Sequence, residues 1–490
     1  MYNVFIVLLK GLINLNKMPI VEGLIDYINE DIIPFHMPGH KNNKRQFNEL
    51  NVIRDNLYKM DNTEVPGLDN LHLPEEMILH SQKLAAQAYK AAKSYFLING
   101  STCGIYSMIT GTTKPGDKII VQRNCHRSVF MACFLGGLNC VYVNPRILDE
   151  FNIAVSVETS DLIKIMDENP DAKAIVITNP TFYGTCCNLE EIVKEAHRRK
   201  ILVLVDEAHG AHFPFNDNLP KSAMECGADV SVVSMHKTTP ALTQTALLNV
   251  SKGVDTEGIE FMLKLYQSTS PSYILLASID TARYIMQEKG RILTDELLVN
   301  INEFRDKMSS IEEYRLLGKE HIGVKGVSDV DITKIVISSN FGGKNLDNLL
   351  RQKYGIQVEM SDVNNITLIC SVGDNKESFD LLYNALIDVI KNKEKVNKSI
   401  HFKKSIPGYK IAINMREAYY TKKRRIRLCE ASGMISGELV APYPPGIPVL
   451  LPGEYITDEI INYIEFVKEN NIPLNGINDG TAEYINVLDV

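Results

Sequence analysis

Between residues 75 and 250, short apolar runs rich in β-branched side chains alternate with stretches of helical spacing. The runs lie at residues 95–98, 118–121, 141–143, 174–178, 201–206 and 228–233, and helices are expected at residues 77–92 and 189–200. Such runs are typical of strands buried on both faces, and their alternation with helices favours a mostly parallel sheet. The sequence therefore predicts an α/β fold, in which ligands bind beyond the carboxyl ends of the strands.

A chain of 490 residues exceeds what one hydrophobic core supports, so several domains are expected. We predict an N-terminal arm at residues 1–35, a major domain at 36–295, a smaller α+β domain at 296–395 and a C-terminal domain at 396–490. Met18 has the character of an alternative start, so residues 1–17 are interpreted as an extension. The proline-rich residues 441–448 are expected to form a rigid turn because proline cannot continue a regular element.

The net charge, the apolar segments and the cysteines of the chain limit the classes of function and the compartment that we expect. A net charge of -8 gives no electrostatic reason to expect nucleic acid as a partner. The apolar residues 4–9 are too few to cross a membrane and lack the flanks of a signal peptide. Nine dispersed cysteines without a CxxC pair predict reduced thiols and a cytoplasmic protein.

Asp206 closes the apolar run 201–206, and Lys237 follows the run 228–233. A carboxylate and a lysine at neighbouring strand ends are what an enzyme needs to hold pyridoxal phosphate (PLP), because the lysine forms a Schiff base and the carboxylate keeps the pyridine nitrogen protonated. The turn at residues 100–102, Gly-Ser-Thr, lies between a strand and a helix and is a natural phosphate cradle. Each feature alone has an ordinary alternative: a helix N-cap for the turn and for Asp206, and a solvated lysine for Lys237. Their joint occurrence, in this order on successive strand ends, favours PLP.

Histidines near these positions allow more than one interpretation. His126, after a turn and a strand, is either a loop residue or a residue that stacks on a cofactor ring. His209 and His212 are close enough in sequence to suggest a metal site, but no convincing third ligand accompanies them. We therefore predict that the chain holds no metal.

Several longer motifs carry a resemblance to a known family. They are HMPGHK at residues 36–41, GST at 100–102, DEAHG at 206–210, SMHKT at 234–238, LTQ at 242–244, STSPSY at 268–273, PYPPGIP at 442–448 and PGE at 452–454. With these motifs the chain resembles the bacterial ornithine/lysine/arginine decarboxylases, which are PLP-dependent enzymes of the aspartate aminotransferase fold. The resemblance runs from His36 to the C-terminus, and the histidine-lysine motif followed by LTQ is specific to this group.

The resemblance implies a role for individual residues. Lys237 would carry the cofactor as the internal aldimine, Asp206 would pair with the pyridine nitrogen, and Ala208 would pack on the ring face opposite His126. The implied cofactor contacts also include Ser101, Thr102, Ser234 and His236 at the phosphate, together with His209. Family members are dimers with the active site at the subunit interface, so Ser270 would reach the partner's cofactor. Glu454 would contact the distal cationic group of the substrate. Residues 1–35 leave no room for the extra domain of larger members, so a homodimer or a dimer of dimers is expected.

The activity implied is decarboxylation of arginine, lysine or ornithine to its amine and CO2, with Lys237 or His236 returning a proton to Cα. Arginine is favoured because short members of the family are linked to arginine and polyamine synthesis. The alternatives are an aminotransferase or a β-eliminating lyase on the same cofactor, in which Arg351 or Arg416 would hold the α-carboxylate. A catalytically silent PLP-binding protein is a further alternative, against which the presence of both Asp206 and Lys237 argues.

Overall fold

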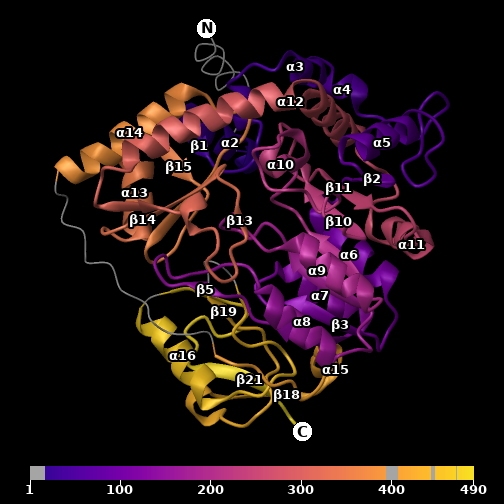
Figure 1. Cartoon of the computed structure of the whole chain (residues 1–490), viewed down its shortest axis with the longest axis vertical. Helices are drawn as coiled ribbons and strands as arrows, with labels where there is room; N and C mark the ends of the chain where they lie inside the picture. Colours follow the sequence, from indigo (N-terminus) through magenta and orange to yellow (C-terminus); the bar gives the residue numbers. More distant parts are fainter. Residues whose placement is uncertain (1–16, 393–406, 443–446, 471) are drawn as a thin grey trace.

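The computed structural model describes residues 17–392, 407–442, 447–470 and 472–490 (Figure 1). Some of the predictions fall on residues outside these ranges. They concern the apolar residues 4–9, nearly all of the extension at 1–17, the domain boundary at 395 and the centre of the proline-rich turn at 443–446.

A seven-stranded sheet forms the centre of the molecule, in the order β2-β11-β10-β9-β7-β3-β4. The strands are β2 (Lys93–Leu97), β3 (Lys118–Gln122), β4 (Asn139–Val143), β7 (Ala174–Thr178), β9 (Leu202–Asp206), β10 (Val230–Ser234) and β11 (Ala246–Val250). All run parallel except β11, which is antiparallel to both of its neighbours, β10 and β2. The predicted α/β fold with a mostly parallel sheet is confirmed.

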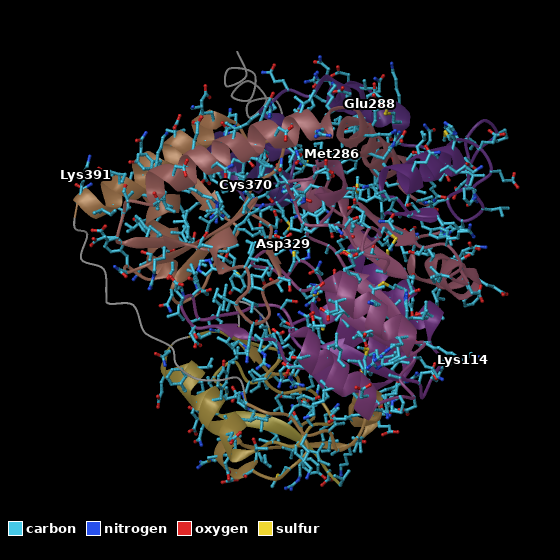
Figure 2. All side chains as sticks on the ribbon, in the orientation of Figure 1. Lys114, Met286, Glu288, Asp329, Cys370 and Lys391 are labelled. Carbon is cyan, nitrogen blue, oxygen red and sulfur yellow. The ribbon has the colours of Figure 1, made fainter. Side chains whose placement is uncertain are left out.

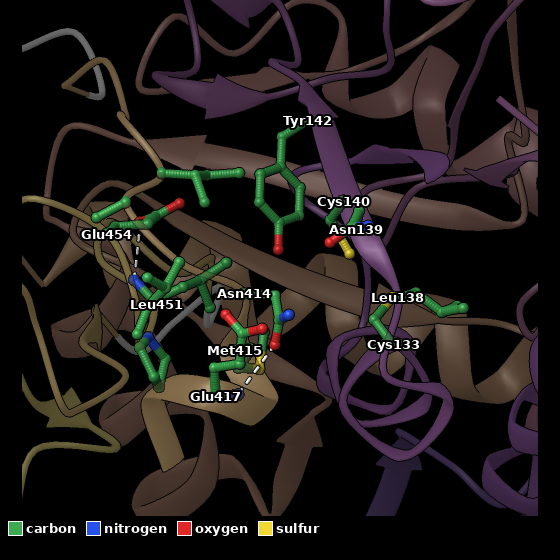
Figure 3. Close-up of a pocket in the computed structure, with 14 residues that line it drawn as sticks. Cys133, Leu138, Asn139, Cys140, Tyr142, Asn414, Met415, Glu417, Leu451 and Glu454 are labelled. Atoms are coloured by element: carbon green, nitrogen blue, oxygen red, sulfur yellow. Dashed lines mark hydrogen bonds between the residues drawn. The ribbon is translucent and has the colours of Figure 1, made fainter. Parts of the chain in front are cut away.

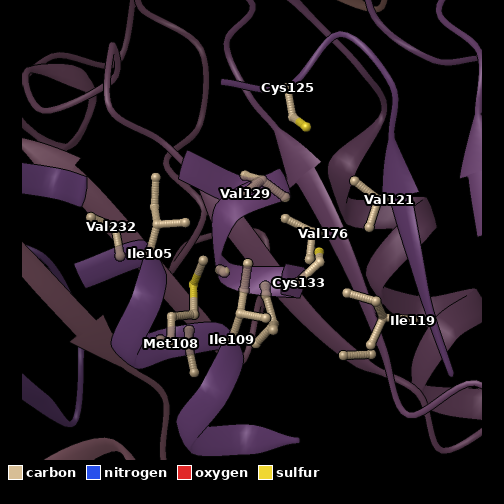
Figure 4. Packing of buried hydrophobic residues seen from close by; sticks show 14 of the residues in the cluster. Ile105, Met108, Ile109, Ile119, Val121, Cys125, Val129, Cys133, Val176 and Val232 are labelled. Carbon is tan, nitrogen blue, oxygen red and sulfur yellow. The ribbon is translucent and has the colours of Figure 1, made fainter. Parts of the chain in front are cut away.

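Both faces of this sheet are buried because alternate residues of each strand enter different cores. Ile119 and Val121 of β3 pack with the helices α6 (Gly100–Thr112) and α7 (Arg127–Gly136) in one cluster, whereas Ile120 belongs to a second cluster on the opposite face. Figure 4 shows the first cluster, with Met108 of α6 and Cys133 of α7 directed toward the strands. Burial on two faces explains why these strands appear in the sequence as continuous apolar runs.

Helices cover the two faces and the edge of the sheet. One face carries α6 (Gly100–Thr112), α7 (Arg127–Gly136) and α11 (Glu257–Tyr266), and the other carries α8 (Thr159–Glu168) and α9 (Leu189–Arg198). The helix α5 (Met77–Ala88) packs beside β2, and α3 (Asn48–Asp55) and α4 (Leu57–Met60) precede it. Short pairs β5 (Ile147–Leu148) with β6 (Ile153–Ala154) and β8 (Thr185–Cys186) with β13 (Asp329–Val330) lie between the larger elements.

The long helix α12 (Tyr273–Met308) leads from the central sheet to a second, four-stranded sheet (Figure 1). This sheet has the order β12-β14-β17-β16 and consists of β12 (Tyr314–Leu316), β14 (Lys334–Ser339), β16 (Met360–Ser361) and β17 (Asn365–Ile369). The helices α13 (Gly343–Tyr354) and α14 (Lys376–Lys391) pack on it together with the C-terminal half of α12. Near the N-terminus, α2 (Pro19–Asn29) is followed by β1 (Ile33–Phe35), which pairs with β15 (Ile356–Val358). Residues 33–35 are thus attached to this second unit.

The C-terminal part has a core of its own, drawn in yellow in Figure 1. It contains α15 (Met415–Tyr420), α16 (Asp458–Glu469), the pair β18 (Lys423–Arg427) with β21 (Tyr484–Leu488) and the pair β19 (Ala441–Pro442) with β20 (Leu474–Asn475). The domain boundaries stay a prediction, and α12 runs without interruption through the one placed at residue 295. In the described ranges, no helix combines the length and the apolar character that a membrane crossing requires.

Candidate active site

The residues predicted to carry the chemistry emerge from the carboxyl ends of parallel strands. Asp206 is the last residue of β9, and Lys237 lies in α10 (Met235–Thr238), directly after β10. The two strands are neighbours, with Val232 opposite Asp206. Gly100 begins α6 just after β2, and His126 precedes α7 just after β3. The site therefore lies at the edge where parallel α/β sheets place their ligands.

Lys237 contacts a histidine that in turn contacts a second lysine. The Lys237 Nζ lies 3.0 Å from His209 Nε2, and Lys334 Nζ lies 2.8 Å from His209 Nδ1. Burial lowers the pKa of Lys237, although the charges of Asp206 and Glu359 oppose the shift. Burial also lowers the pKa of Lys334 to about 8, with Lys237 contributing, and it lowers the pKa of His209 well below its ordinary value. These groups are thus easier to deprotonate than the same groups in water.

Asp206 is buried and supplies negative charge to this edge of the sheet. Its Oδ1 accepts a hydrogen bond from the backbone N–H of Ala208 at 3.2 Å. His126 caps α7, because its Nδ1 accepts from the Ser128 N–H at 3.3 Å and lies 2.8 Å from the Ser128 Oγ. Burial lowers the pKa of His126, while the charge of Asp206 opposes the shift. The helix-capping role of this histidine uses its Nδ1 and not its Nε2.

The turn at Gly100 is not an ordinary hydroxyl-capped helix start. The N-cap of α6 is Asn99, which makes no side-chain capping bond, so Ser101 and Thr102 lie inside the first helical turn. Gly100 has φ +72 and faces open space, since an added Cβ would meet no atom within 4 Å. The hydroxyls of Ser234 and Thr238, which flank Lys237, are buried without a hydrogen-bond partner among the described residues. Unpartnered buried hydroxyls require an explanation, and a bound phosphate would supply one.

His236 has a fixed tautomer. Its Nδ1 donates a hydrogen bond to the carbonyl oxygen of Thr245 at 3.0 Å, so the Nε2 of the neutral ring is an acceptor. Burial lowers the pKa of His236 to about 4. The ring is therefore neutral near pH 7 in the cofactor-free chain.

Glu454 lies in a buried environment beside Arg123. Both of its carboxylate oxygens bind the guanidinium of Arg123, at 2.7 and 2.8 Å, and Oε2 also accepts from the Leu451 N–H at 2.9 Å. Arg123 is 1% exposed and Glu454 2%, and the guanidinium stacks on the rings of Tyr142 and Tyr409. Figure 3 shows Glu454 and Tyr142 beside a pocket of about 310 Å³. The substrate contact stays a prediction, and the ion pair argues against it because the carboxylate is already neutralised.

Other predicted residues have partners away from Lys237. Ser270 is exposed, and its N–H donates to the Oγ of Ser268 at 3.2 Å. Arg351 pairs with Glu30, and Arg416 donates to the carbonyl of Leu135 at 3.2 Å. The Nε2 of His212 contacts Thr333 Oγ1 at 3.0 Å and Asp331 Oδ1 at 3.4 Å. In the described ranges, no cluster of three or more His, Cys, Asp or Glu side chains could hold a metal ion.

Two buried basic residues, Lys334 and Arg123, are not among the site residues predicted from the sequence. Each is a basic residue placed directly at one end of an apolar strand, Lys334 at the start of β14 and Arg123 just after β3. A lysine or arginine in such a position is rarely buried unless it has a specific partner. That position marks both residues as candidates, although Lys93 and Lys118 also stand at strand ends and are not buried.

Comparison with known proteins gives the family. The major domain of the Orn/Lys/Arg decarboxylases matches residues 18–378, and their C-terminal domain matches residues 398–481. The arginine decarboxylase of Bacillus subtilis (strain 168) is 36% identical over 481 residues, which cover 96% of this chain and 98% of that protein. Among solved structures, the constitutive lysine decarboxylase of E. coli has a TM-score of 0.75 at 18% identity, covering 97% of this chain and 82% of that one. A structure of SPT with PLP as an internal aldimine has a TM-score of 0.57 at 15% identity, covering 74% and 87%. The chain therefore belongs to the Orn/Lys/Arg decarboxylase family and is a decarboxylase that acts on a basic amino acid.

Proposed function

We propose that this chain binds PLP at the carboxyl edge of the seven-stranded sheet and decarboxylates arginine to its amine. The observation that carries the proposal is the placement of Asp206 and Lys237 at the ends of two adjacent parallel strands. PLP needs a basic nitrogen for covalent attachment and an acid at its pyridine nitrogen, and these two residues supply them.

The residues around this pair fit the cofactor. A phosphate would find hydrogen-bond donors in the unpartnered hydroxyl of Ser234 and in the hydroxyls of Ser101 and Thr102. The open turn at Gly100 would leave space for it. His126 and Ala208 would lie on the two faces of the ring, and His209 would be a further contact. His236 would join the phosphate contacts by gaining a proton there, because its Nε2 carries none in the neutral ring.

Bound PLP supplies an electron sink for the pair of electrons left when CO2 departs. Asp206 would make this sink effective, because a buried carboxylate that paired with the pyridine nitrogen would favour its protonated form. Each unit by which the pKa of that nitrogen rises corresponds to about 1.4 kcal/mol. The surrounding burial also keeps water from the carboxylate that is lost, which favours neutral CO2.

Lys237 is the better candidate for returning the proton to Cα. The Nδ1–H of His236 is used on the carbonyl of Thr245, and a proton gained on its Nε2 would be used on the phosphate, so neither proton would be directed at Cα. Lys237 has an amine that burial makes easier to deprotonate, which suits a group that must both accept and donate a proton near pH 7.

Arginine is proposed as the substrate because the curated relatives with 36% identity over nearly the whole chain are arginine decarboxylases. The aminotransferase alternative gains no support, since Arg351 and Arg416 have partners elsewhere. We further propose a homodimer in which Ser270, exposed in the single chain, reaches the partner's cofactor. Nine unpaired cysteines support a reducing compartment, the cytoplasm.

The test is to incubate the purified protein and PLP separately with arginine, lysine and ornithine and to identify the products. We expect CO2 and the corresponding amine from arginine, at a kcat/KM well above that for the other two. A keto acid in place of CO2 would mean transamination. Bound PLP without turnover of any of the three amino acids would mean a silent cofactor-binding protein.

A further inference from the structure

Lys237 lies in a helix that is too short to hold its shape by itself. The helix α10 (Met235–Thr238) has four residues, and its N-cap, Ser234, makes no side-chain capping bond. Such a helix depends on tertiary contacts, because nucleation is costly and its last carbonyl groups have no partners within the helix. One external contact is the hydrogen bond from the Met235 N–H to the carbonyl oxygen of Thr245, at 3.0 Å. The position of Lys237 therefore depends on what else contacts α10 from outside.

The loop at residues 36–41, which is the HMPGHK motif, supplies a second contact. The N–H of Gly39 donates a hydrogen bond to the carbonyl oxygen of His236 at 2.7 Å. A Cβ at position 39 would lie 2.6 Å from the carbonyl oxygen of Thr239 and 3.0 Å from its nitrogen. Gly39 does not have a positive φ, so the close approach is what requires glycine here. The loop thus packs directly on the backbone before and after Lys237.

Residues at the end of β17 hold the same loop from the four-stranded sheet. The carbonyl oxygen of Gly39 accepts a hydrogen bond from the Ser371 Oγ at 2.5 Å. Lys41 is 1% exposed, and its Nζ donates to the carbonyl oxygen of Ile369 at 2.7 Å. Cys370, which stands between Ile369 and Ser371, is labelled near the centre of the molecule in Figure 2. The loop is therefore fixed on one side to the four-stranded sheet and on the other side to α10.

We propose that Gly39 is a positioning residue for Lys237, because it holds the backbone of α10 where the Lys237 amine reaches the cofactor. The proposal rests on the proposed function, in which Lys237 captures PLP. In capture, the Lys237 nitrogen bonds to the aldehyde carbon, and the aldehyde oxygen leaves as water. Such a step depends steeply on geometry, and a misplacement of about 1 Å can slow it roughly 100-fold. Gly39 would thus control capture without touching the cofactor.

The test replaces Gly39 by alanine, because the added methyl group forces the loop and α10 apart. The full-length chain is freed of its cofactor and mixed with PLP at several pH values. The adduct is then reduced with borohydride and quantified on the Lys237 peptide, so no turnover is needed. The urea midpoint of each variant is measured in parallel, so that a loss of stability is recorded separately from a loss of capture.

Gly111→Ala is the matched control, because it introduces a similar clash elsewhere in the fold. A Cβ at Gly111 would lie 2.7 Å from the backbone nitrogen and the Cα of Ile259, so the substitution forces α6 and α11 apart. Gly111 lies near the C-terminal end of α6, at the opposite end from the turn at Gly100. An effect of lost stability alone would therefore appear in both variants.

We expect both substitutions to lower the urea midpoint, and only Gly39→Ala to slow the capture of PLP by the folded protein, by roughly tenfold. The factor should be the same at every pH, since the substitution changes the position of the amine and adds or removes no charge. In the cofactor-free chain, Gly39→Ala should also speed hydrogen exchange at the amides of residues 235–239, because α10 loses an external contact.

The outcomes separate the two proposals. If the parent chain forms no adduct at Lys237, the proposed function is wrong. If the parent forms the adduct but folded Gly39→Ala captures PLP at the parental rate, or Gly111→Ala slows capture by the same factor, the role of Gly39 is wrong. Should Gly39→Ala not fold, Ser371→Ala decides, because it removes the hydroxyl that fixes the Gly39 carbonyl. We expect slower capture in that variant, and a parental rate would equally overturn the role of Gly39.

Discussion

The buried pair of Arg123 and Glu454 allows a prediction that separates a structural role from a substrate contact. Glu454→Gln removes the negative charge and leaves the guanidinium of Arg123 buried at 1% exposure without its counter-ion. Breaking a buried ion pair by removing one partner costs about 3–5 kcal/mol, because an uncompensated charge remains. We therefore expect a large fall in the free energy of unfolding, seen as a lower urea midpoint by circular dichroism.

Two further variants make the measurement specific. Glu303→Gln is the matched control, because Glu303 forms an ion pair with Lys376 at 2.6 Å in which both side chains are exposed. Such a surface pair contributes less than about 1 kcal/mol. The double variant Arg123→Met, Glu454→Leu should recover much of the lost stability, since replacing both charges by apolar groups leaves no buried charge.

The KM for the substrate distinguishes a structural role of Glu454 from a substrate contact. If Glu454 supports the fold, Glu454→Gln lowers the urea midpoint and leaves the KM for the basic amino acid near the parental value while the protein is folded. If Glu454→Gln unfolds no more easily than Glu303→Gln but its KM rises at least tenfold, our reasoning is refuted and Glu454 contacts the distal cation of the substrate.

Three more predictions concern the site itself. Lys237→Ala should abolish turnover and the visible absorbance band of the bound cofactor, and persistence of both in the purified variant would exclude Lys237 as the attachment point. Asp206→Ala should still bind PLP but lose most of kcat, because the pyridine nitrogen loses its carboxylate partner; a parental kcat would contradict the electron-sink argument. For His236 the pKa is lowered from 6.5 to about 4, so the unfolded chain binds more protons between these values. The cofactor-free protein should therefore lose about 3 kcal/mol as the pH falls through this interval, and urea midpoints at pH 7 and pH 5 should differ less in His236→Gln.

Most of the central sheet could be predicted because its strands carry a local signal. The run 174–178 coincides with β7, and the other predicted runs overlap their strands by most of their length. The exception is β11, which was not predicted. Its sequence is short and includes Asn249, whose Oδ1 accepts a hydrogen bond from Ser94 in the neighbouring strand at 2.6 Å. A buried polar residue such as Asn249 interrupts the apolar run by which a buried strand is predicted. In addition, short apolar runs do not distinguish a strand from a helix.

The same difference between local sequence signals and tertiary contacts applies to the residues of the site. Asp206 and Lys237 could be predicted because each follows its own strand, and parallel strands bring their carboxyl ends to one edge. Lys334 belongs to a strand of the other sheet, so its position beside His209 depends on how the two sheets meet. The Arg123–Glu454 pair joins residues 331 positions apart in the chain. Neither contact leaves a periodic signal, because a single charged residue at a strand end has the same local sequence whether it is solvated or paired. What local sequence can give is a set of basic residues that border strands, and tertiary structure then separates them, because Lys334 and Arg123 are buried whereas Lys93 and Lys118 are not.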